Sequence, residues 1–237
     1  MIATTETQIA GLRTLIVTPA GRPRMTVVIL HGFAMVPDDL APFAATLQLP
    51  ATFLFPQAPH AVAPRGFAWW EVDQVARDES IRNGPRDLAN AFPPGRLSAR
   101  ATLQALLQEL RTRFPDNVLI LGGFSQGGML SLDTMLQPSA GISALILMSS
   151  SRIALEEWRG NRSRLQNLPI LVSHGREDAD LAFSAGEALR DFVAEAGASV
   201  TWVPFDGGHQ TPLVVWRQVR KFLQRLAPSG IGLQPGD

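Results

Sequence analysis

Residues 118–128 read Val-Leu-Ile-Leu-Gly-Gly-Phe-Ser-Gln-Gly-Gly, and the architecture can be worked out from this stretch. Its first half is a nearly continuous apolar run, which is typical of a strand buried on both faces of a parallel sheet. Its second half contains Gly-x-Ser-x-Gly, directly before a segment with helical character. A sharp strand-to-helix turn strains the backbone at Ser125 and requires small residues two positions away, which Gly123 and Gly127 supply. The stretch predicts a serine exposed at such a turn, against the alternative of a glycine-rich turn whose serine only caps the helix.

Strands and helices alternate on both sides of this stretch. Similar apolar runs occupy 26–31, 142–148 and 168–174, weaker ones occupy 52–55 and 200–205, and an antiparallel edge strand is expected over 12–18. Helical spacing of apolar residues is found over 98–114, with Ser98 as a candidate N-cap, and over 126–136, 184–196 and 211–226. This alternation predicts the α/β class, with a mostly parallel central sheet and helices on both faces.

The chain 1–237 is expected to form a single domain, because this length suits one α/β core. The link 148–168 is too short to hold a separate cap domain. Residues 56–95 contain many prolines, two adjacent tryptophans and little periodicity, so we expect an irregular segment at the rim of a cleft. The segment 227–237 is rich in Gly and Pro and is expected to be a mobile tail.

Composition excludes several classes of function. Lys plus Arg equals Asp plus Glu at 21 each, so no overall basic field favours nucleic acid. The chain has no cysteine, which excludes disulfides, thiolate metal sites and a cysteine nucleophile. No His-Glu-x-x-His or phosphate-binding glycine motif is present, so neither a metal nor a cofactor is expected. The start of the chain does not resemble a secretory signal, and no apolar run approaches the roughly 18 residues of a membrane span; a cytoplasmic protein is expected.

A serine hydroxyl needs a general base, and that base needs a carboxylate to orient it. In proteins with a serine at a strand-to-helix turn, these partners follow in the order Ser, acid, His, each on a loop after a strand. Asp178 lies on the loop after the strand 168–174, and His209 lies just beyond the strand 200–205. The spacing predicts Ser125 as nucleophile, His209 as base and Asp178 as the orienting acid.

Other acids and histidines compete for these roles. Glu177 and Asp180 flank Asp178, and either could replace it as the acid. Asp206 is too close in sequence to His209 for the usual geometry and is expected to shape the turn.

Three further histidines precede the acid in the sequence. His31 and His174 end strands and precede glycines, so both are expected to be structural. His60 lies in the irregular segment. Its side chain could either be exposed to solvent or line the cleft. His209 is the only histidine downstream of the acid.

The negative charge of a tetrahedral intermediate requires fixed N–H donors. The backbone N–H of Gln126, the residue after the nucleophile, is one candidate. The N–H of Phe33, on the loop after the strand 26–31, is the second. Phe33, Trp69 and Trp70 are candidate walls of the substrate pocket.

The ordered motifs resemble the carboxylesterase and acyl-protein thioesterase family, also called the phospholipase/carboxylesterase group, from about Val27 to Leu223. The resemblance is carried by Leu30-His31-Gly32-Phe33, Phe55-Pro56-Gln57-Ala58-Pro59, Trp69-Trp70, Gly122-Gly123-Phe124-Ser125-Gln126-Gly127-Gly128, Ser173-His174-Gly175 with Asp178, Phe183-Ser184-Ala185-Gly186 and Gly208-His209. It implies an α/β-hydrolase fold without a cofactor, an esterase or thioesterase activity, the triad Ser125, Asp178 and His209, and oxyanion donors at Phe33 and Gln126.

Two stretches depart from the family pattern. Ala34-Met35-Val36 stands where relatives often carry Gly and an acidic residue, and Ala179-Asp180-Leu181 stands where they tend to carry an apolar-Pro run. Both departures bear on the shape of the substrate pocket and leave the triad intact.

The leading interpretation is a serine hydrolase that cleaves carboxylic esters of small to medium acyl chain through an acyl-serine intermediate. Hydrolysis of thioesters on acylated proteins and deacylation of lysophospholipids are alternatives within the same chemistry. A catalytically silent binding protein on a hydrolase scaffold is an alternative of another class. The expected partner is a small acyl ester or thioester, and a homodimer is conceivable if the tryptophan segment is exposed.

Overall fold

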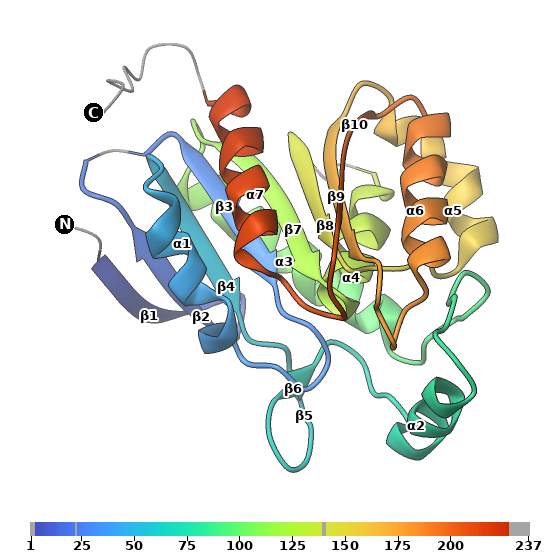
Figure 1. The fold of residues 1–237 in the computed structure, drawn as a ribbon. Helices are drawn as coiled ribbons and strands as arrows, with labels where there is room; N and C mark the ends of the chain where they lie inside the picture. Colours follow the sequence, from blue (N-terminus) through green and yellow to red (C-terminus); the bar gives the residue numbers. More distant parts are fainter. Residues whose placement is uncertain (1–2, 22, 139–140, 228–237) are drawn as a thin grey trace.

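Eight strands form the central sheet, in the order β1-β2-β4-β3-β7-β8-β9-β10 (Figure 1). The protein is described here by a computed structural model, which covers residues 3–21, 23–138 and 141–227. The strands of the sheet are β1 (Ala3–Ile9), β2 (Leu12–Thr18), β3 (Met25–Leu30), β4 (Ala51–Pro56), β7 (Val118–Phe124), β8 (Ala144–Met148), β9 (Pro169–Gly175) and β10 (Ser199–Phe205). From β4 to β10 all neighbours are parallel, whereas β2 is antiparallel to both β1 and β4. The predicted mostly parallel sheet is confirmed.

The central strands are buried along their whole length, as their apolar runs predict. Every residue of β3, β4 and β8 is buried. Strands β3 and β7 are paired with Leu30 opposite Gly123, so the two strands end side by side. The residues that follow them, the loop after Leu30 and the turn at Ser125, therefore begin next to each other.

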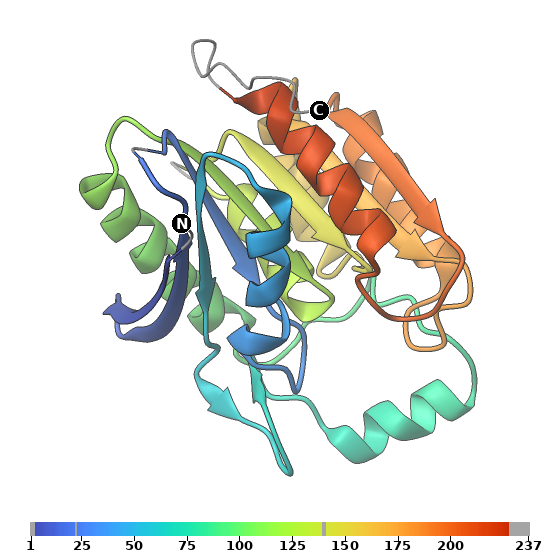
Figure 2. The same ribbon diagram turned by 60° about the vertical axis from the view of Figure 1, so that its left-hand side comes forward.

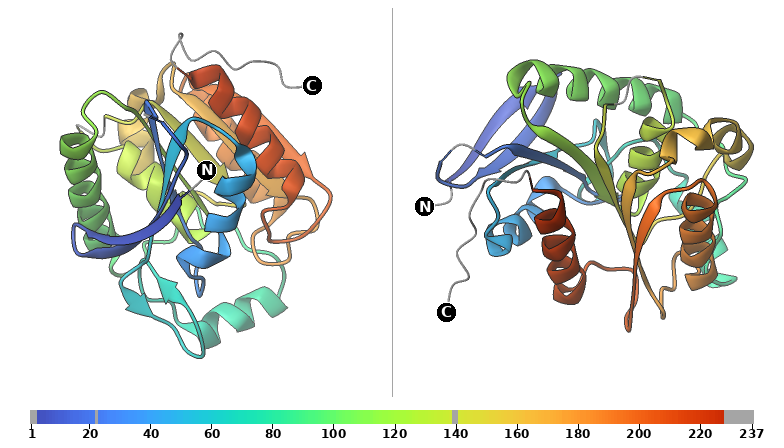
Figure 3. Two further views of the ribbon diagram at one scale, coloured as in Figure 1. Left: turned by 90° about the vertical axis from the view of Figure 1, so that its left-hand side faces the viewer. Right: turned by 90° about the horizontal axis from the view of Figure 1, so that it is seen from above.

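Helices cover both faces of the sheet (Figure 3). Helices α1 (Ala41–Leu47) and α7 (Leu213–Leu226) pack with one apolar cluster, in which Trp216 and Phe222 of α7 are buried. The second cluster lies on the other face and takes in side chains of α3 (Arg96–Arg113), α4 (Gln126–Met135), α5 (Leu155–Asn161) and α6 (Phe183–Glu195). Two short 3-10 helices, η1 (Pro37–Asp39) and η2 (Arg162–Leu165), complete the connections. None of the described helices is long and apolar enough to cross a bilayer.

The chain leaves β3 and β7 toward opposite faces of the sheet. After β3 it reaches α1, which packs with one apolar cluster, and after β7 it enters α4, which packs with the other. In open α/β sheets, ligands bind where neighbouring strands diverge in this way, outside the carboxyl ends of the strands. The fold thus places a crevice beside Ser125.

The segment 56–95, predicted to be irregular, contains regular structure. It forms the two-stranded ladder of β5 (His60–Ala61) and β6 (Phe67–Ala68), followed by α2 (Gln74–Arg82). Figure 2 shows both elements beyond the carboxyl ends of the parallel strands. The prediction failed because β5 and β6 have two residues each and α2 buries no residue, so no apolar periodicity marks them.

Two further details differ from the sequence-based expectations, and a third expectation falls on residues that the structure does not describe. Strand β2 is not the edge strand, because β1, whose side chains are mostly exposed and polar, pairs outside it. Helix α3 begins at Arg96 after Gly95, and not near Ser98. The reason is tertiary: the buried Arg96 side chain pairs with Asp133 of α4 and draws the first turn inward. The tail 227–237, expected to be mobile, lies outside the described residues except for Ala227.

Candidate active site

Ser125 sits at the turn between β7 and α4 with φ 53° and ψ −117°, a conformation that L-residues rarely adopt. Its N–H donates to the Met148 carbonyl of β8 at 2.8 Å, which fixes the turn to the sheet. A Cβ at Gly123 would lie 2.4 Å from the backbone carbon of Gly127, and one at Gly127 would lie 2.4 Å from the Leu30 carbonyl oxygen. Only glycine fits either position.

Three side chains from separate loops form one chain of hydrogen bonds. His209 Nε2 lies 2.9 Å from Ser125 Oγ, and His209 Nδ1 lies 2.7 Å from Asp178 Oδ2. In the neutral tautomer with hydrogen on Nδ1, the ring donates to the carboxylate and accepts from the hydroxyl. The Phe124 ring packs against the imidazole with the centroids 4.7 Å apart. This geometry lets the imidazole take the serine proton while the carboxylate stabilises the resulting charge.

The backbone holds the carboxylate of Asp178 in place. Its Oδ1 accepts from the N–H of Asp180 at 2.9 Å and from the N–H of Leu181 at 2.8 Å, and the residue is 3% exposed. Of the alternative acids, Glu177 is exposed and Asp180 forms ion pairs with arginines instead of contacting His209 through a hydrogen bond. Asp206 is exposed, and its carboxylate lies 3.4 Å from Arg176.

The two predicted oxyanion donors, the backbone N–H groups of Phe33 and Gln126, both belong to residues that line the cavity beside Ser125. Gln126 begins α4, so its N–H belongs to the positive end of the helix. Phe33 follows the end of β3, and no described residue accepts a hydrogen bond from its N–H. Ala34, next to it, has φ 59° and donates to the Phe67 carbonyl at 3.0 Å, which ties this loop to β6. An oxyanion on an acyl carbon needs two such fixed donors, so these two N–H groups stay the candidates that the sequence predicted.

His31 anchors the loop that carries Phe33. Its Nδ1 donates to the Gly32 carbonyl at 2.8 Å, and its Nε2 accepts from the Ala58 N–H at 3.0 Å. Burial lowers the pKa of His31 to about 4, so the ring stays neutral at neutral pH and keeps both bonds. The structural role expected for His31 agrees with these contacts.

His174 is also buried, and burial lowers its pKa below the ordinary value. Its Nε2 donates to the Leu181 carbonyl at 3.0 Å, so the ring helps hold the loop that carries Asp178. His60, by contrast, is half-buried in β5 and borders a second cavity of about 480 Å³ beside the main one.

The two tryptophans have different surroundings. Trp70 borders the cavity next to Ser125, but Trp69 does not: its ring is fully buried and its Nε1 donates to the His31 carbonyl at 2.9 Å. The expectation that Trp69 contacts substrate is therefore corrected, because the indole fills the space under the loop of His31. Phe33 is half-buried and borders the cavity, as expected.

Sequence reasoning did not find three buried serines at the end of β8. Ser149 has φ 42° and its hydroxyl donates to the Gln210 carbonyl at 3.3 Å; Ser150 donates to the Ser125 carbonyl at 3.1 Å. Ser151 accepts from the Leu88 N–H at 3.2 Å. The available signal was a run of polar residues at the carboxyl end of a buried strand, next to the strand of the nucleophile.

A cavity of about 700 Å³ opens beside Ser125 and His209. Its walls are formed by loops at the carboxyl ends of the parallel strands and by the segment 56–95. Its apolar lining includes Phe33, Met35, Leu40, Phe43, Trp70, Val72, Leu88, Phe124, Met129 and Leu181, and its charged lining includes Asp39, Glu71, Asp73, Arg77, Arg86 and Asp180. The cavity can hold an apolar acyl chain with its carbonyl carbon near the Ser125 hydroxyl.

A parallel sheet of this strand order, with a serine at a strained turn and a carboxylate and a histidine on later loops, defines an α/β-hydrolase. The chain belongs to the phospholipase/carboxylesterase family, whose model matches residues 13–227. Among known proteins, it is 24% identical over 233 residues to acyl-protein thioesterase 1 of Neurospora crassa, covering 90% of this chain and 91% of that protein. It is 24% identical over 198 residues to acyl-protein thioesterase 1 of Yarrowia lipolytica, covering 77% of this chain and 82% of that one.

Solved structures show the same fold. The carboxylesterase from Mesorhizobium loti superposes with a TM-score of 0.73 at 18% identity, over 94% of this chain and 98% of that chain. Zea mays acyl-protein thioesterase 2 superposes with a TM-score of 0.70 at 23% identity, over 90% of this chain and 98% of that one. The predictions of the family, the α/β-hydrolase fold and a hydrolase that cleaves esters or thioesters are confirmed.

Proposed function

We propose that the protein hydrolyses carboxylic esters of small to medium acyl chain through an acyl intermediate on Ser125, with His209 as general base and Asp178 as its orienting acid. The observation that carries the proposal is the continuous chain of hydrogen bonds from Asp178 Oδ2 through His209 to Ser125 Oγ, at 2.7 and 2.9 Å. A serine, a base and an orienting acid in mutual contact act as one unit in acyl transfer.

In the first half of the reaction, Ser125 Oγ forms a bond to the acyl carbon while its proton passes to His209 Nε2. The carbonyl oxygen becomes an oxyanion, which accepts hydrogen bonds from the backbone N–H groups of Phe33 and Gln126. When the tetrahedral intermediate collapses, the bond to the leaving alcohol breaks and His209 donates its proton to that oxygen. Asp178 stabilises the imidazolium throughout.

In the second half, water replaces the alcohol. His209 Nε2 takes a proton from the water as its oxygen bonds to the acyl carbon, and the same two N–H groups bind the second oxyanion. The bond between the acyl carbon and Ser125 Oγ then breaks, the serine regains its proton from His209, and the carboxylic acid leaves. Apart from the attacking water, the chain's own residues supply the nucleophile, the base and the hydrogen-bond donors used in these steps.

The cavity supports the choice of acyl size. Its volume of about 700 Å³ lies within the usual range for small-molecule sites, and its lining beside Ser125 includes Phe124, Met129 and Leu181. Each methylene of an acyl chain buried there contributes about 0.8 kcal/mol of binding. We therefore expect kcat/KM to rise with acyl length until the chain fills the cavity.

The test is hydrolysis of p-nitrophenyl esters from acetate to decanoate by the purified protein and by Ser125→Ala. We expect the variant to fold normally and to lose activity by about 10⁴-fold or more. Labelling by an active-site serine probe should disappear with it. Equal rates in the two proteins would rule out Ser125 as the nucleophile of this reaction.

A thioesterase is the second candidate, favoured by the names of the relatives from Neurospora crassa and Yarrowia lipolytica. Ester and thioester substrates with the same acyl chain, together with a lysophospholipid, should be compared at equal concentration. A higher kcat/KM for the thioester would replace the ester proposal. Failure of all three substrates and of the serine probe would favour a silent binding protein. The single-domain organisation, the cytoplasmic location and the homodimer remain predictions.

A further inference from the structure

Helix α2 contributes to the cavity wall while burying none of its own residues. It begins after Asp73, whose carboxylate caps it by accepting from the Ala76 N–H at 3.0 Å. Figures 1 and 2 show it beside the carboxyl ends of the strands, apart from the helices that pack on the sheet. A nine-residue helix without a buried face is marginal in water, so specific contacts must hold α2 in place.

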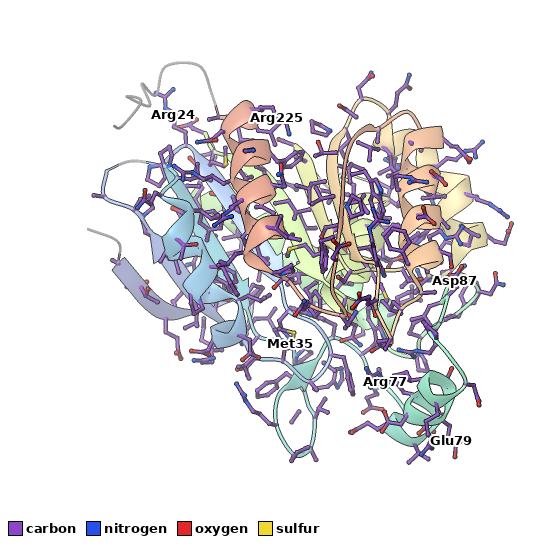
Figure 4. The ribbon with its side chains drawn as sticks, in the orientation of Figure 1. Arg24, Met35, Arg77, Glu79, Asp87 and Arg225 are labelled. Carbon is purple, nitrogen blue, oxygen red and sulfur yellow. The ribbon has the colours of Figure 1, made fainter. Side chains whose placement is uncertain are left out.

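Arg77 makes those contacts from the inward side of α2. Figure 4 shows Arg77 between α2 and the body of the protein, and Glu79 on the far side of the helix. The Arg77 guanidinium forms an ion pair with Asp180, and its central carbon lies 5.4 Å from the centre of the Phe33 ring. It also lies 3.3 Å from the exposed carboxylate of Asp78. One side chain thus spans the cavity from the loop of the predicted oxyanion donor to the loop of the predicted acid.

Asp180 is held from two sides. Its second oxygen pairs with Arg86, whose backbone N–H donates to the Asp180 carbonyl at 2.9 Å and whose carbonyl accepts from the Ala182 N–H at 2.9 Å. Burial acts to raise the pKa of Asp180, but the hydrogen bond from Arg86 and the charges of His209, Arg86 and Arg77 outweigh it, and the pKa lies below its ordinary value. The Arg77 and Asp180 side chains are 24% and 12% exposed, so water shields this pair less than a surface pair.

We propose that Arg77 and Asp180 form a latch that holds α2 as a roof over the acyl cavity, which makes both residues determinants of acyl-chain specificity. The inference rests on the proposed ester hydrolysis and names the part of the chain that selects the substrate.

The geometry explains why the latch would act on long acyl chains. Val72 and Arg77 form part of the cavity wall on the α2 side, and the methylene stem of an arginine offers apolar surface to a ligand. An acetyl group bound to Ser125 stays near the nucleophile, whereas a longer chain extends toward the roof. Releasing α2 would remove contacts from the long chain only.

The first experiment measures amide hydrogen exchange over 74–82 in the wild type, in three latch variants and in one control variant. Arg77→Gln and Asp180→Asn should each speed exchange of α2 by about three- to fivefold, and the double variant should add little to Asp180→Asn, which already removes the pair with Arg77. Asp180→Asn keeps the backbone N–H that donates to Asp178. Arg82→Gln is the matched control, since Arg82 is exposed on the same helix and no ion pair joins it to another described residue.

The second experiment measures KM and kcat for acetate, butyrate and octanoate esters with the same proteins. Both latch variants should raise KM for the octanoate ester by about tenfold and change KM for the acetate ester much less. The preference of the protein for long over short acyl chains would therefore decrease. Arg77→Lys, which keeps the charge, should lie between Arg77→Gln and the wild type. Arg82→Gln should match the wild type.

Exchange of α2 that is the same in all variants would overturn the latch, and so would a KM change that is equal for all chain lengths. Arg77→Gln leaves the pair between Asp180 and Arg86 intact, so it tests the proposal even if Asp180→Asn fails to fold. The exchange measurement needs no turnover. A protein without esterase activity but with the expected exchange would contradict the proposed function and leave the latch standing.

Discussion

The side-chain amide of Gln126 joins the nucleophile turn to the wall of the cavity. Its Oε1 accepts from the Trp69 N–H at 2.8 Å, and its Nε2 donates to the Trp70 carbonyl at 3.0 Å. The residue that carries a predicted oxyanion donor thus also fixes the segment that carries both tryptophans.

Gln126→Glu should weaken the site while keeping the backbone N–H. A carboxylate in place of the amide loses the donor to the Trp70 carbonyl and is buried, which should lower the free energy of unfolding by about 1–3 kcal/mol. Urea unfolding and the rate of ester hydrolysis measure the two effects. Gln104→Glu, on the exposed face of α3, is the control and should change neither. Equal stability of the Gln126→Glu protein and the wild type would refute the role given to this amide.

Asp178→Asn tests the identity of the acid. The amide oxygen is expected to stay on the N–H groups of Asp180 and Leu181, so the amide NH2 faces His209 Nδ1, cannot accept from it and carries no charge to stabilise the imidazolium. We therefore expect kcat to fall by about 10²- to 10⁴-fold, less than in Ser125→Ala. Glu177→Gln should retain nearly full kcat because Glu177 is exposed. A larger loss in Glu177→Gln than in Asp178→Asn would reassign the acid.

Gly127→Ala should destabilise the fold through a direct collision. The added Cβ would meet the Leu30 carbonyl oxygen at 2.4 Å and the His31 carbonyl oxygen at 2.7 Å, both backbone atoms that cannot move aside. We expect a loss of about 3 kcal/mol or more in the free energy of unfolding. The matched control is Gly160→Ala in α5, where no heavy atom lies within 4 Å; a gain of up to about 1 kcal/mol is expected there. Similar Tm values for the two variants would contradict the packing argument.

His31 should make the protein sensitive to acid. Its pKa is about 4 in the folded protein against 6.5 for the free side chain, so the unfolded state binds more protons between these values. The free energy of unfolding therefore falls as the pH drops through this window, by up to about 3 kcal/mol from this group alone. His174, whose pKa is also lowered by burial, acts in the same direction.

Urea unfolding from about pH 7 to about pH 4 measures the effect of His31. His31→Gln should be less stable than the wild type near neutral pH and should lose less stability toward acid. His60→Gln, at a half-buried position in β5, is the control for replacing a histidine by glutamine. Parallel curves for His31→Gln and the wild type would show that His31 takes up its proton over the same pH range in the folded and unfolded states, which would contradict the prediction.

Local patterns were sufficient for the parallel strands and for the order of the three predicted triad residues. Strand β7 spans 118–124, as its apolar run predicts, because a strand buried on both faces needs an unbroken apolar sequence. The sequence interval between Gly123 and Gly127 also identified the turn, because only glycine tolerates the approach of the backbone there. Helix α2 was not predicted, because a helix that buries none of its residues shows no helical spacing of apolar side chains.

The α/β class, the strained turn at Ser125 and the candidates for acid and base could be predicted, because each depends on residues that are neighbours in the chain or in one element. The folded structure was needed to show that Asp178 contacts His209 while Asp180 pairs with arginines, and that Trp70 borders the cavity while Trp69 fills the space under His31. These choices depend on contacts across 31 to 103 residues of sequence, whose distances and burial no local pattern encodes.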